Sequence, residues 1–386
     1  MTINDVELFL VEREAIGSEP PIPSVLVRLA TKSGLEGWGE AGLAWRASEL
    51  PARRDILLSI LAGRSAFDIE ELLDLEALRP RPLQAAVEMA SWDLVGQVAG
   101  LPLCCLFGGQ YRQRLPLGIR LHGATIEQVL QLSREMAEQG FHWQTVSAAG
   151  RLSSDEDVVT ALVEAVGDRV ELRLDGRGVY NPEQALELCR RIEDVPLDFL
   201  LDPLADRRLE PLSALRRQTT VPLAVSRAIE GPADVMALIR GGAARLAIID
   251  VQRVGGLANA RRCGTIAQAA GIGASLSAGP SVGIAMAAML QLAAATPAAI
   301  VRSVTGPVPA HRPLRLKARE VAPSIHQRNL GIGPAALPWS SLVLACRQST
   351  ARTARVRTPD HPDALPLRRS GRCVSSPAQP DLSSVP

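Results

Sequence analysis

The chain has 386 residues, of which 47% are hydrophobic and 22% charged, so it can bury a large core and, on length alone, form two or three domains. Its formal net charge of +1, without a basic patch interleaved with aromatic residues, argues against nucleic-acid binding. The longest apolar run, 282–290, is too short to span a bilayer, and the acidic N-terminus does not resemble a signal peptide, so we expect a cytoplasmic protein without a membrane partner.

The N-terminal part of the chain predicts an antiparallel sheet followed by a helix. Apolar and polar residues alternate in three runs that predict strands, 2–11, 24–31 and 35–41. The Pro-, Gly- and Ser-rich stretch 14–23 predicts a mobile loop. Apolar residues recur at helical spacing from Leu83 to Val98, and the helix should end at Gly100. We therefore predict an α+β domain over residues 1–115.

From Pro116 the pattern changes to short strands that alternate with amphipathic helices. The strand candidates are 117–121, 144–147, 171–175, 199–202, 223–226, 246–251, 274–277 and 299–304. Helical periodicity lies between them at 125–138, 154–166, 182–192, 210–218, 232–239, 257–270 and 281–295. Eight apolar strands joined by helices favour a βα barrel over 116–305, although an open parallel sheet has the same periodicity.

The register of strands and helices is lost after Thr305. Residues 306–345 are expected to return and pack on the first domain. The stretch 346–386 is rich in Ser, Pro and Arg with few aliphatic residues, which predicts a disordered basic tail. A solvated tail is the simpler interpretation, and a binding segment is the alternative.

Two adjacent barrel strands end in acidic residues, at Asp175 and Asp202. Catalytic groups of a βα barrel lie where its strands end, at the C-terminal face. An aspartate that closes a barrel strand is therefore a candidate metal ligand or base.

Several motifs occur together in a characteristic order and spacing over residues 1–297. They are Gly37-Trp38-Gly39-Glu40-Ala41, Ala90-Ser91-Trp92-Asp93-Leu94-Val95-Gly96, Gly100-Leu101-Pro102-Leu103, Leu174-Asp175, Asp202-Pro203 and Arg253-Val254-Gly255-Gly256. The set resembles the mandelate racemase and muconate lactonizing enzyme branch of the enolase superfamily. The resemblance implies an N-terminal α+β capping domain, a modified (βα)7β barrel of the TIM type and a homo-oligomer. It also implies an Mg²⁺ ion that stabilises the enediolate formed when a base removes the proton next to a carboxylate.

The acid and base positions of that family are substituted here. The resemblance places its Lys-x-Lys pair at Thr145 and Ser147, and its catalytic histidine at Ser277. A serine hydroxyl needs an activating neighbour before it can take a carbon-bound proton. Asp250 matches the aspartate that orients the histidine, so it is the one catalytic candidate retained, and an ion pair with Arg253 is its structural alternative.

The metal-ligand positions are also depleted. By the resemblance, the first ligand matches Asp175, the second falls on Leu201 because Pro203 fixes the register, and the third falls on Ser226. Asp202 lies one place after Leu201 and, in a strand, should point to the opposite face. Mg²⁺ prefers several carboxylate ligands in octahedral geometry, so one carboxylate should bind it poorly.

Two arginines follow metal-ligand positions of the family, Arg177 after the retained Asp175 and Arg227 after the substituted Ser226. Either guanidinium can take the place of the cation or pair with Asp175. Both can also bind the carboxylate of a small ligand through two parallel hydrogen bonds, which makes them the candidate substrate-binding residues.

Two functional hypotheses follow. In the first, the protein is catalytically degenerate, needs no cofactor, and keeps its barrel as a scaffold for a carboxylate ligand or for oligomerisation. In the second, it is a divergent Mg²⁺-dependent racemase, cycloisomerase or dehydratase that uses Asp175 and Asp250 with a repositioned base. The second gains support if Asp202 or Glu230 points into the barrel beside Asp175.

Overall fold

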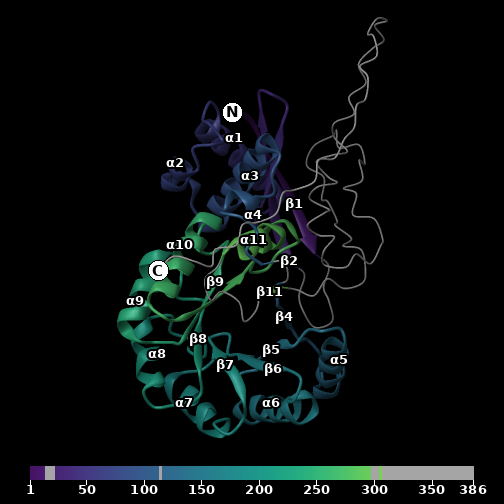
Figure 1. The fold of residues 1–386 in the computed structure, drawn as a ribbon, viewed down its shortest axis with the longest axis vertical. Coiled ribbons are helices and arrows are strands. Elements are labelled where there is room, and N and C mark those ends of the chain that lie inside the picture. The colour runs from purple at the N-terminus through teal and green to yellow at the C-terminus, as the bar shows by residue number, and fades with distance from the viewer. Residues whose placement is uncertain (14–21, 113–114, 297–303, 307–386) are drawn as a thin grey trace, which may run out of the picture.

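The computed structural model describes residues 1–13, 22–112, 115–296 and 304–306 (Figure 1). The predicted loop 14–23 lies outside this part of the chain except for its last two residues, which begin a strand. The predicted C-terminal segment from residue 307 onward and the tail 346–386 lie outside it as well. Within the described part, no helix has both the length and the apolar character needed to cross a membrane.

The N-terminal part folds as the predicted antiparallel sheet with helices against it, and we call it the cap. Its strands, in spatial order, are β1 (Ile3–Arg13), β2 (Ile22–Thr31) and β3 (Glu36–Ala41). Its helices are α1 (Leu50–Leu61), α2 (Ile69–Asp74), α3 (Arg81–Ala99) and α4 (Leu103–Leu106). The predicted helix is α3, which ends at Gly100 with a left-handed φ of 64°. The sequence pattern does not predict α1 and α2.

The two glycines of β3 explain how α3 lies against the sheet. A β-carbon on Gly37 would lie 2.1 Å from the carbonyl oxygen of Ala90, and one on Gly39 would lie 1.8 Å from that of Ala86. Real β-carbons do not approach backbone oxygens so closely. The Gly-Trp-Gly motif is therefore a packing motif, because it lets the backbone of α3 contact β3 directly.

The second part of the chain forms a closed barrel of eight parallel strands, in the spatial order β10-β11-β4-β5-β6-β7-β8-β9. The strands are β4 (Leu117–Arg120), β5 (Trp143–Ser147), β6 (Glu171–Asp175), β7 (Leu197–Leu201), β8 (Leu223–Val225), β9 (Leu246–Asp250), β10 (Gly273–Ser277) and β11 (Val304–Gly306). The helices between them are α5 (Ile126–Glu138), α6 (Leu152–Val166), α7 (Pro182–Arg191), α8 (Leu209–Arg216), α9 (Pro232–Gly241), α10 (Leu257–Ala269) and α11 (Ile284–Ala295). The predicted capped barrel is confirmed.

Side chains alternate between the outside and the inside of this barrel. Outward residues such as Leu174 and Leu200 join the large core beneath the helices. The inward residues Phe199, Leu201 and Ile248 form a separate apolar cluster within the barrel. Where the strands end, the inward positions form a ring that we call the mouth: Arg120, Ser147, Asp175, Leu201, Ser226, Asp250 and Ser277.

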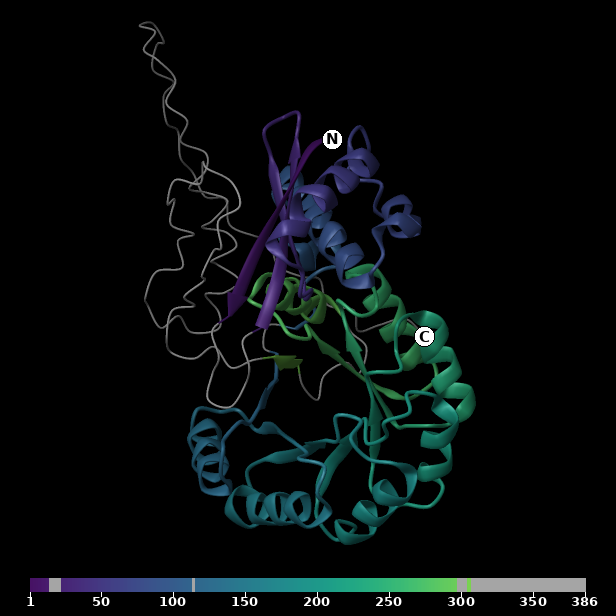
Figure 2. The same cartoon turned by 180° about the vertical axis from the view of Figure 1, so that it is seen from behind.

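The cap lies over the C-terminal end of the barrel, next to α10 and α11 (Figures 1 and 2). Glu40 of β3 is fully buried and accepts hydrogen bonds from the backbone N–H groups of Val282, Gly283 and Ala285, where α11 begins, and from the hydroxyl of Ser281. A carboxylate at this position satisfies the free N–H groups of the first helical turn and complements the helix dipole.

A second cap carboxylate, Glu88 of α3, plays the same part for α10. It accepts hydrogen bonds from the backbone N–H groups of Leu257 and Ala258 and from the indole of Trp92. The side chain of Gln252, which follows β9, binds Gly42 of the cap and the carbonyl of Ala278. These contacts fix the cap on the loops that surround the mouth.

Candidate binding site at the barrel mouth

Asp175 lies at the end of β6, as predicted, and is paired with an arginine that the sequence analysis did not single out. Arg120, the last residue of β4, places one guanidinium nitrogen 2.7 Å from Asp175 Oδ2. The other guanidinium nitrogen donates to Ser147 Oγ at 2.7 Å. The second Asp175 oxygen accepts the backbone N–H of Arg177 at 2.9 Å. Asp175 therefore has a partner on both oxygens, and its cationic partner comes from the first barrel strand.

Asp202 does not follow the strand alternation, because β7 ends at Leu201 and Asp202 has a left-handed φ of 43°. Its carboxylate accepts the backbone N–H groups of Ser226 at 2.9 Å and Arg227 at 3.1 Å, at the end of β8. Burial and, to a smaller extent, the nearby charge of Asp175 raise the pKa of Asp202 to about 6, against the opposing effect of these hydrogen bonds. Asp202 thus lies within electrostatic range of Asp175 but is bound to backbone groups.

The donor set at the mouth does not fit an Mg²⁺ ion. Leu201, at the position of the second family ligand, offers no donor and packs inside the barrel against Phe199. Ser226 offers a hydroxyl, and Asp175 is bound to Arg120. In the part of the chain that the structure describes, no group of three or more His, Cys, Asp or Glu side chains is arranged to hold a metal. The mouth therefore lacks the set of free carboxylate ligands that an Mg²⁺ ion requires.

The two predicted substrate-binding arginines lie on neighbouring loops at the mouth, after β6 and β8. Arg227 donates from its guanidinium to the carbonyl oxygen of Arg177 at 2.9 Å. A β-carbon on Gly178 would overlap this guanidinium, so only glycine leaves room for it there. Arg177 itself has a left-handed φ of 55°, and its side chain is exposed. The structure brings the Arg227 side chain to the Arg177 backbone, while Arg120 lies beside Asp175.

On the other side of the mouth, Asp250 ends β9 beside Ser277 of β10. It accepts the backbone N–H groups of Gln252 at 3.0 Å and Arg253 at 3.3 Å. Burial raises its pKa, and the positive charge of Arg253 partly opposes the rise. A β-carbon on Gly279 would lie 2.6 Å from Asp250 Oδ2, so the loop after β10 covers the carboxylate.

The resemblance places the family's acid and base at Ser147, Ser277 and Thr145, and the contacts of these hydroxyls can be described one by one. Ser147 accepts from the Arg120 guanidinium, which is not a base. Ser277 accepts the backbone N–H of Gly279 at 3.0 Å. Thr145 is buried, and its hydroxyl has no hydrogen-bond partner among the described residues. None of these contacts activates a hydroxyl for proton abstraction.

Arg120 is the site residue that sequence reasoning missed. The signal was present, because Arg120 is a charged residue near the end of the predicted strand 117–121, which is the rule that singled out Asp175. The family resemblance marks only positions where the family carries functional groups, and the first strand is not among them.

Comparison with known proteins places this geometry in a family. Residues 11–108 match the model of the mandelate racemase / muconate lactonizing enzyme N-terminal domain, and residues 128–328 match that of the enolase C-terminal domain-like family. Muconate cycloisomerase 1 of Rhodococcus opacus is 27% identical over 77% of this chain and 83% of its own length. The L-Lys-D/L-Arg epimerase of Methylococcus capsulatus is 31% identical over 74% of this chain and 83% of its own length.

Solved structures show the same fold. The dipeptide epimerase of Enterococcus faecalis V583 is 25% identical and superimposes with a TM-score of 0.71 over 79% of this chain and 90% of its own. A second structure of that epimerase, complexed with Mg and the dipeptide L-Leu-L-Tyr, has a TM-score of 0.72 at 24% identity, over the same shares of both chains. The chain therefore belongs to the mandelate racemase / muconate lactonizing enzyme branch of the enolase superfamily.

Proposed function

We propose that the mouth of this barrel binds a small carboxylate ligand through arginine and that it does not carry out metal-assisted proton abstraction. The observation that carries the proposal is the ion pair between Arg120 and Asp175, with 2.7 Å between the nitrogen and the oxygen. This ion pair supports the proposal because the resemblance implies a metal ion beside Asp175, and positions 201 and 226 offer no carboxylate. A guanidinium can bind a carboxylate, but it cannot supply the divalent charge that an enediolate requires.

The cations that remain available for a ligand are those of Arg227 and Arg177. Arg227 is held in place by its bond to the Arg177 carbonyl and by the open space above Gly178. This bond uses one guanidinium nitrogen, and the others can donate to an anion in the mouth. Because the Arg227 side chain is fixed before a ligand arrives, little entropy is lost on binding.

The test is calorimetric titration with cis,cis-muconate, a small dicarboxylate suggested by the cycloisomerase relative, in buffer that contains a metal chelator. The wild type should bind saturably, and Arg227→Ala should weaken binding about tenfold through loss of a charge-assisted hydrogen bond. Asp175→Ala should instead tighten binding, because it frees the Arg120 guanidinium for the ligand. Arg240→Ala, at an exposed arginine of α9, is the matched control and should change nothing.

Weaker muconate binding in Asp175→Ala would contradict the proposal, because it would mean that the aspartate helps to hold the ligand, as a metal ligand does. Saturable binding that Arg227→Ala leaves unchanged would show that the arginines are not the site. An absence of saturable binding by muconate and by the dipeptide L-Leu-L-Tyr would also count against the proposal.

A second candidate function, Mg²⁺-dependent racemisation, cycloisomerisation or dehydration, rests on a different observation. Asp202 lies close enough to Asp175 for their charges to interact, so two carboxylates lie near each other on this side of the mouth. The relatives that are epimerases and cycloisomerases favour the same chemistry. Exchange of the α-proton of L-Leu-L-Tyr in deuterated water with added Mg²⁺, followed by NMR, would support it if Asp175→Ala abolished the exchange.

A further inference from the structure

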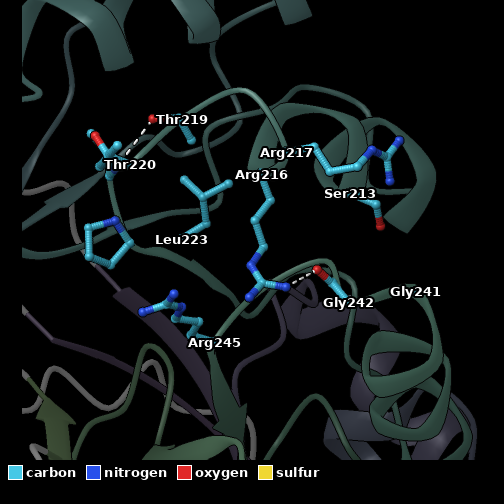
Figure 3. Close-up of a pocket in the computed structure, with 11 residues that line it drawn as sticks. Ser213, Arg216, Arg217, Thr219, Thr220, Leu223, Gly241, Gly242 and Arg245 are labelled. Atoms are coloured by element: carbon cyan, nitrogen blue, oxygen red, sulfur yellow. Dashed lines mark hydrogen bonds between the residues drawn. The ribbon is translucent and has the colours of Figure 1, made fainter.

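A cavity of about 530 Å³ lies at the end of the barrel opposite to the mouth. It is bounded by the residues that join α8 to β8 and α9 to β9, so it opens where these strands begin (Figure 3). Its lining consists of Ser213, Arg216, Arg217, Thr219, Thr220, Val221, Pro222, Leu223, Gly241, Gly242 and Arg245. We call it the basic cavity.

The charged side chains that line the basic cavity are all positive. Three arginines and three hydroxyl side chains line the basic cavity, whereas no aspartate or glutamate does. The chain as a whole carries a net charge of only +1, so this local excess is not a general property of its surface. The guanidinium groups of Arg217 and Arg245 have no ion-pair or hydrogen-bond partner among the described residues, and both residues are exposed.

The ends of two helices offset part of this positive charge. Arg216 donates to the carbonyl oxygen of Gly242, just after α9, as Figure 3 shows. The carbonyl ends of α8 and α9 both lie here, and each is equivalent to about half a negative charge. Three guanidinium groups against two helix ends leave an excess of about two positive charges. An excess of this size matches a phosphate dianion.

The rest of the lining suits a ligand that carries more than phosphate. Val221 and Leu223 are buried apolar residues that contribute to the wall, and Pro222 lies between them. The Thr219 hydroxyl accepts the backbone N–H of Val221 at 3.1 Å and is hydrogen-bonded to the Cys189 thiol, so it fixes the shape of the wall. The volume falls within the range of small-molecule sites, roughly 300–1,000 Å³.

We propose that the basic cavity binds a phosphate-bearing small molecule, with Arg245 and Arg217 on the phosphate and residues 221–223 against its organic part. Arg216 stays on Gly242 and sets the shape of the site. This site is separate from the mouth, because the two lie at opposite ends of the same strands.

The test is calorimetry on the full chain with pyrophosphate, inorganic phosphate and phenyl phosphate, in chloride buffer of constant ionic strength. All three should bind saturably, pyrophosphate with a dissociation constant below about 1 mM, and phenyl phosphate more tightly than inorganic phosphate. Arg245→Ala and Arg217→Ala should each weaken binding about tenfold. Arg240→Ala removes an exposed arginine that does not line the cavity, so it should leave binding unchanged.

Cross-controls separate this proposal from the one for the mouth. Arg227→Ala should leave pyrophosphate binding intact, and Arg245→Ala should leave muconate binding intact. The proposal is overturned if no saturable heat appears up to about 10 mM phosphate, or if Arg240→Ala weakens binding as much as Arg245→Ala, which would indicate diffuse surface charge. Binding that survives Arg245→Ala and Arg217→Ala together would overturn it too. Circular dichroism checks that each variant is folded.

Discussion

The chemistry of the mouth depends on a few side chains at the ends of strands. Asp175 lies where the resemblance places the first metal ligand, but its partner is Arg120 of the first strand, and the residue where the resemblance places the second ligand is Leu201. The sequence predicted which positions lack donors, because that requires only the register. It did not predict which cation meets Asp175, because β4 and β6 are separated by β5 and their side chains meet only across the inside of the curved sheet.

A double-mutant cycle on Arg120→Ala and Asp175→Ala tests this ion pair. Arg120 is about a third exposed, so solvent screens the pair, and we expect a coupling energy of about 1 kcal/mol in urea unfolding, well below that of a fully buried pair. The exposed pair between Arg262 and Glu70 provides the control cycle and should couple by about 0.5 kcal/mol or less. A coupling energy of zero for Arg120 and Asp175 would mean that the two side chains do not form an ion pair in solution.

Asp202 shows a second limit of sequence reasoning at this scale. Strand alternation predicted that its side chain points away from that of Leu201. The strand ends one residue earlier and the backbone turns into the left-handed region at Asp202, so the alternation rule does not apply. No residue pattern marks such a turn, since aspartate is only one of several residues that tolerate it.

At the scale of elements, periodicity located the barrel strands and helices to within a few residues, and the last strand lies partly outside the described residues. Each helix has an apolar face toward the strands, so local pattern and packing agree. The helix α1 was missed because apolar and polar residues do not separate clearly along it. Only its Leu50, Leu57 and Leu61 are buried. The sequence pattern did not predict the contacts between the cap helices, the cap strands and the barrel helices.

Glu88 makes the start of α10 sensitive to pH. Its burial raises its pKa from 4.5 to about 7. The folded state therefore binds a proton more tightly than the unfolded state. The contribution of Glu88 to the free energy of unfolding is fully present below pH 4.5 and is lost as the pH rises through about 7. The change over this window is up to about 3 kcal/mol.

Urea unfolding of the wild type and Glu88→Gln across this pH window measures the effect. The difference between their free energies of unfolding should move in favour of the glutamine variant as the pH rises, because glutamine cannot ionise. Glu76→Gln, in the short helix before α3, controls for loss of one exposed carboxylate and should track the wild type. If the free energies of unfolding of the wild type and Glu88→Gln change in parallel with pH, the pKa of Glu88 is not raised.

Glu40 should matter more to stability than its single side chain suggests. It is fully buried and bound to the first turn of α11 and to Ser24 and Ser281. Glu40→Ala leaves several buried N–H groups without an acceptor, so we expect a loss of about 3–5 kcal/mol in the free energy of unfolding. Glu36→Ala, on the same strand but paired at the surface with Arg28, should lose no more than about 1 kcal/mol. Equal losses in the two variants would show that Glu40 does not hold the cap on the barrel.

At the scale of the whole molecule, the two ends of the barrel differ in chemistry. The mouth holds paired acids and arginines beneath the cap, whereas the opposite end holds the basic cavity. The family resemblance predicted the capped barrel and the end at which the mouth lies. It did not predict the basic cavity, because that cavity is formed by loops on which the family motifs do not lie.

The central claim is that this barrel keeps the family's fold without its metal site. Titration calorimetry with Mg²⁺, on the wild type and Asp175→Ala, tests it most directly. We predict no saturable heat for either protein up to about 10 mM Mg²⁺, because the positions that should supply three carboxylates supply one, and that one is bound to Arg120. Binding at micromolar Mg²⁺ that disappears in Asp175→Ala would contradict the claim and establish the metal-dependent function instead.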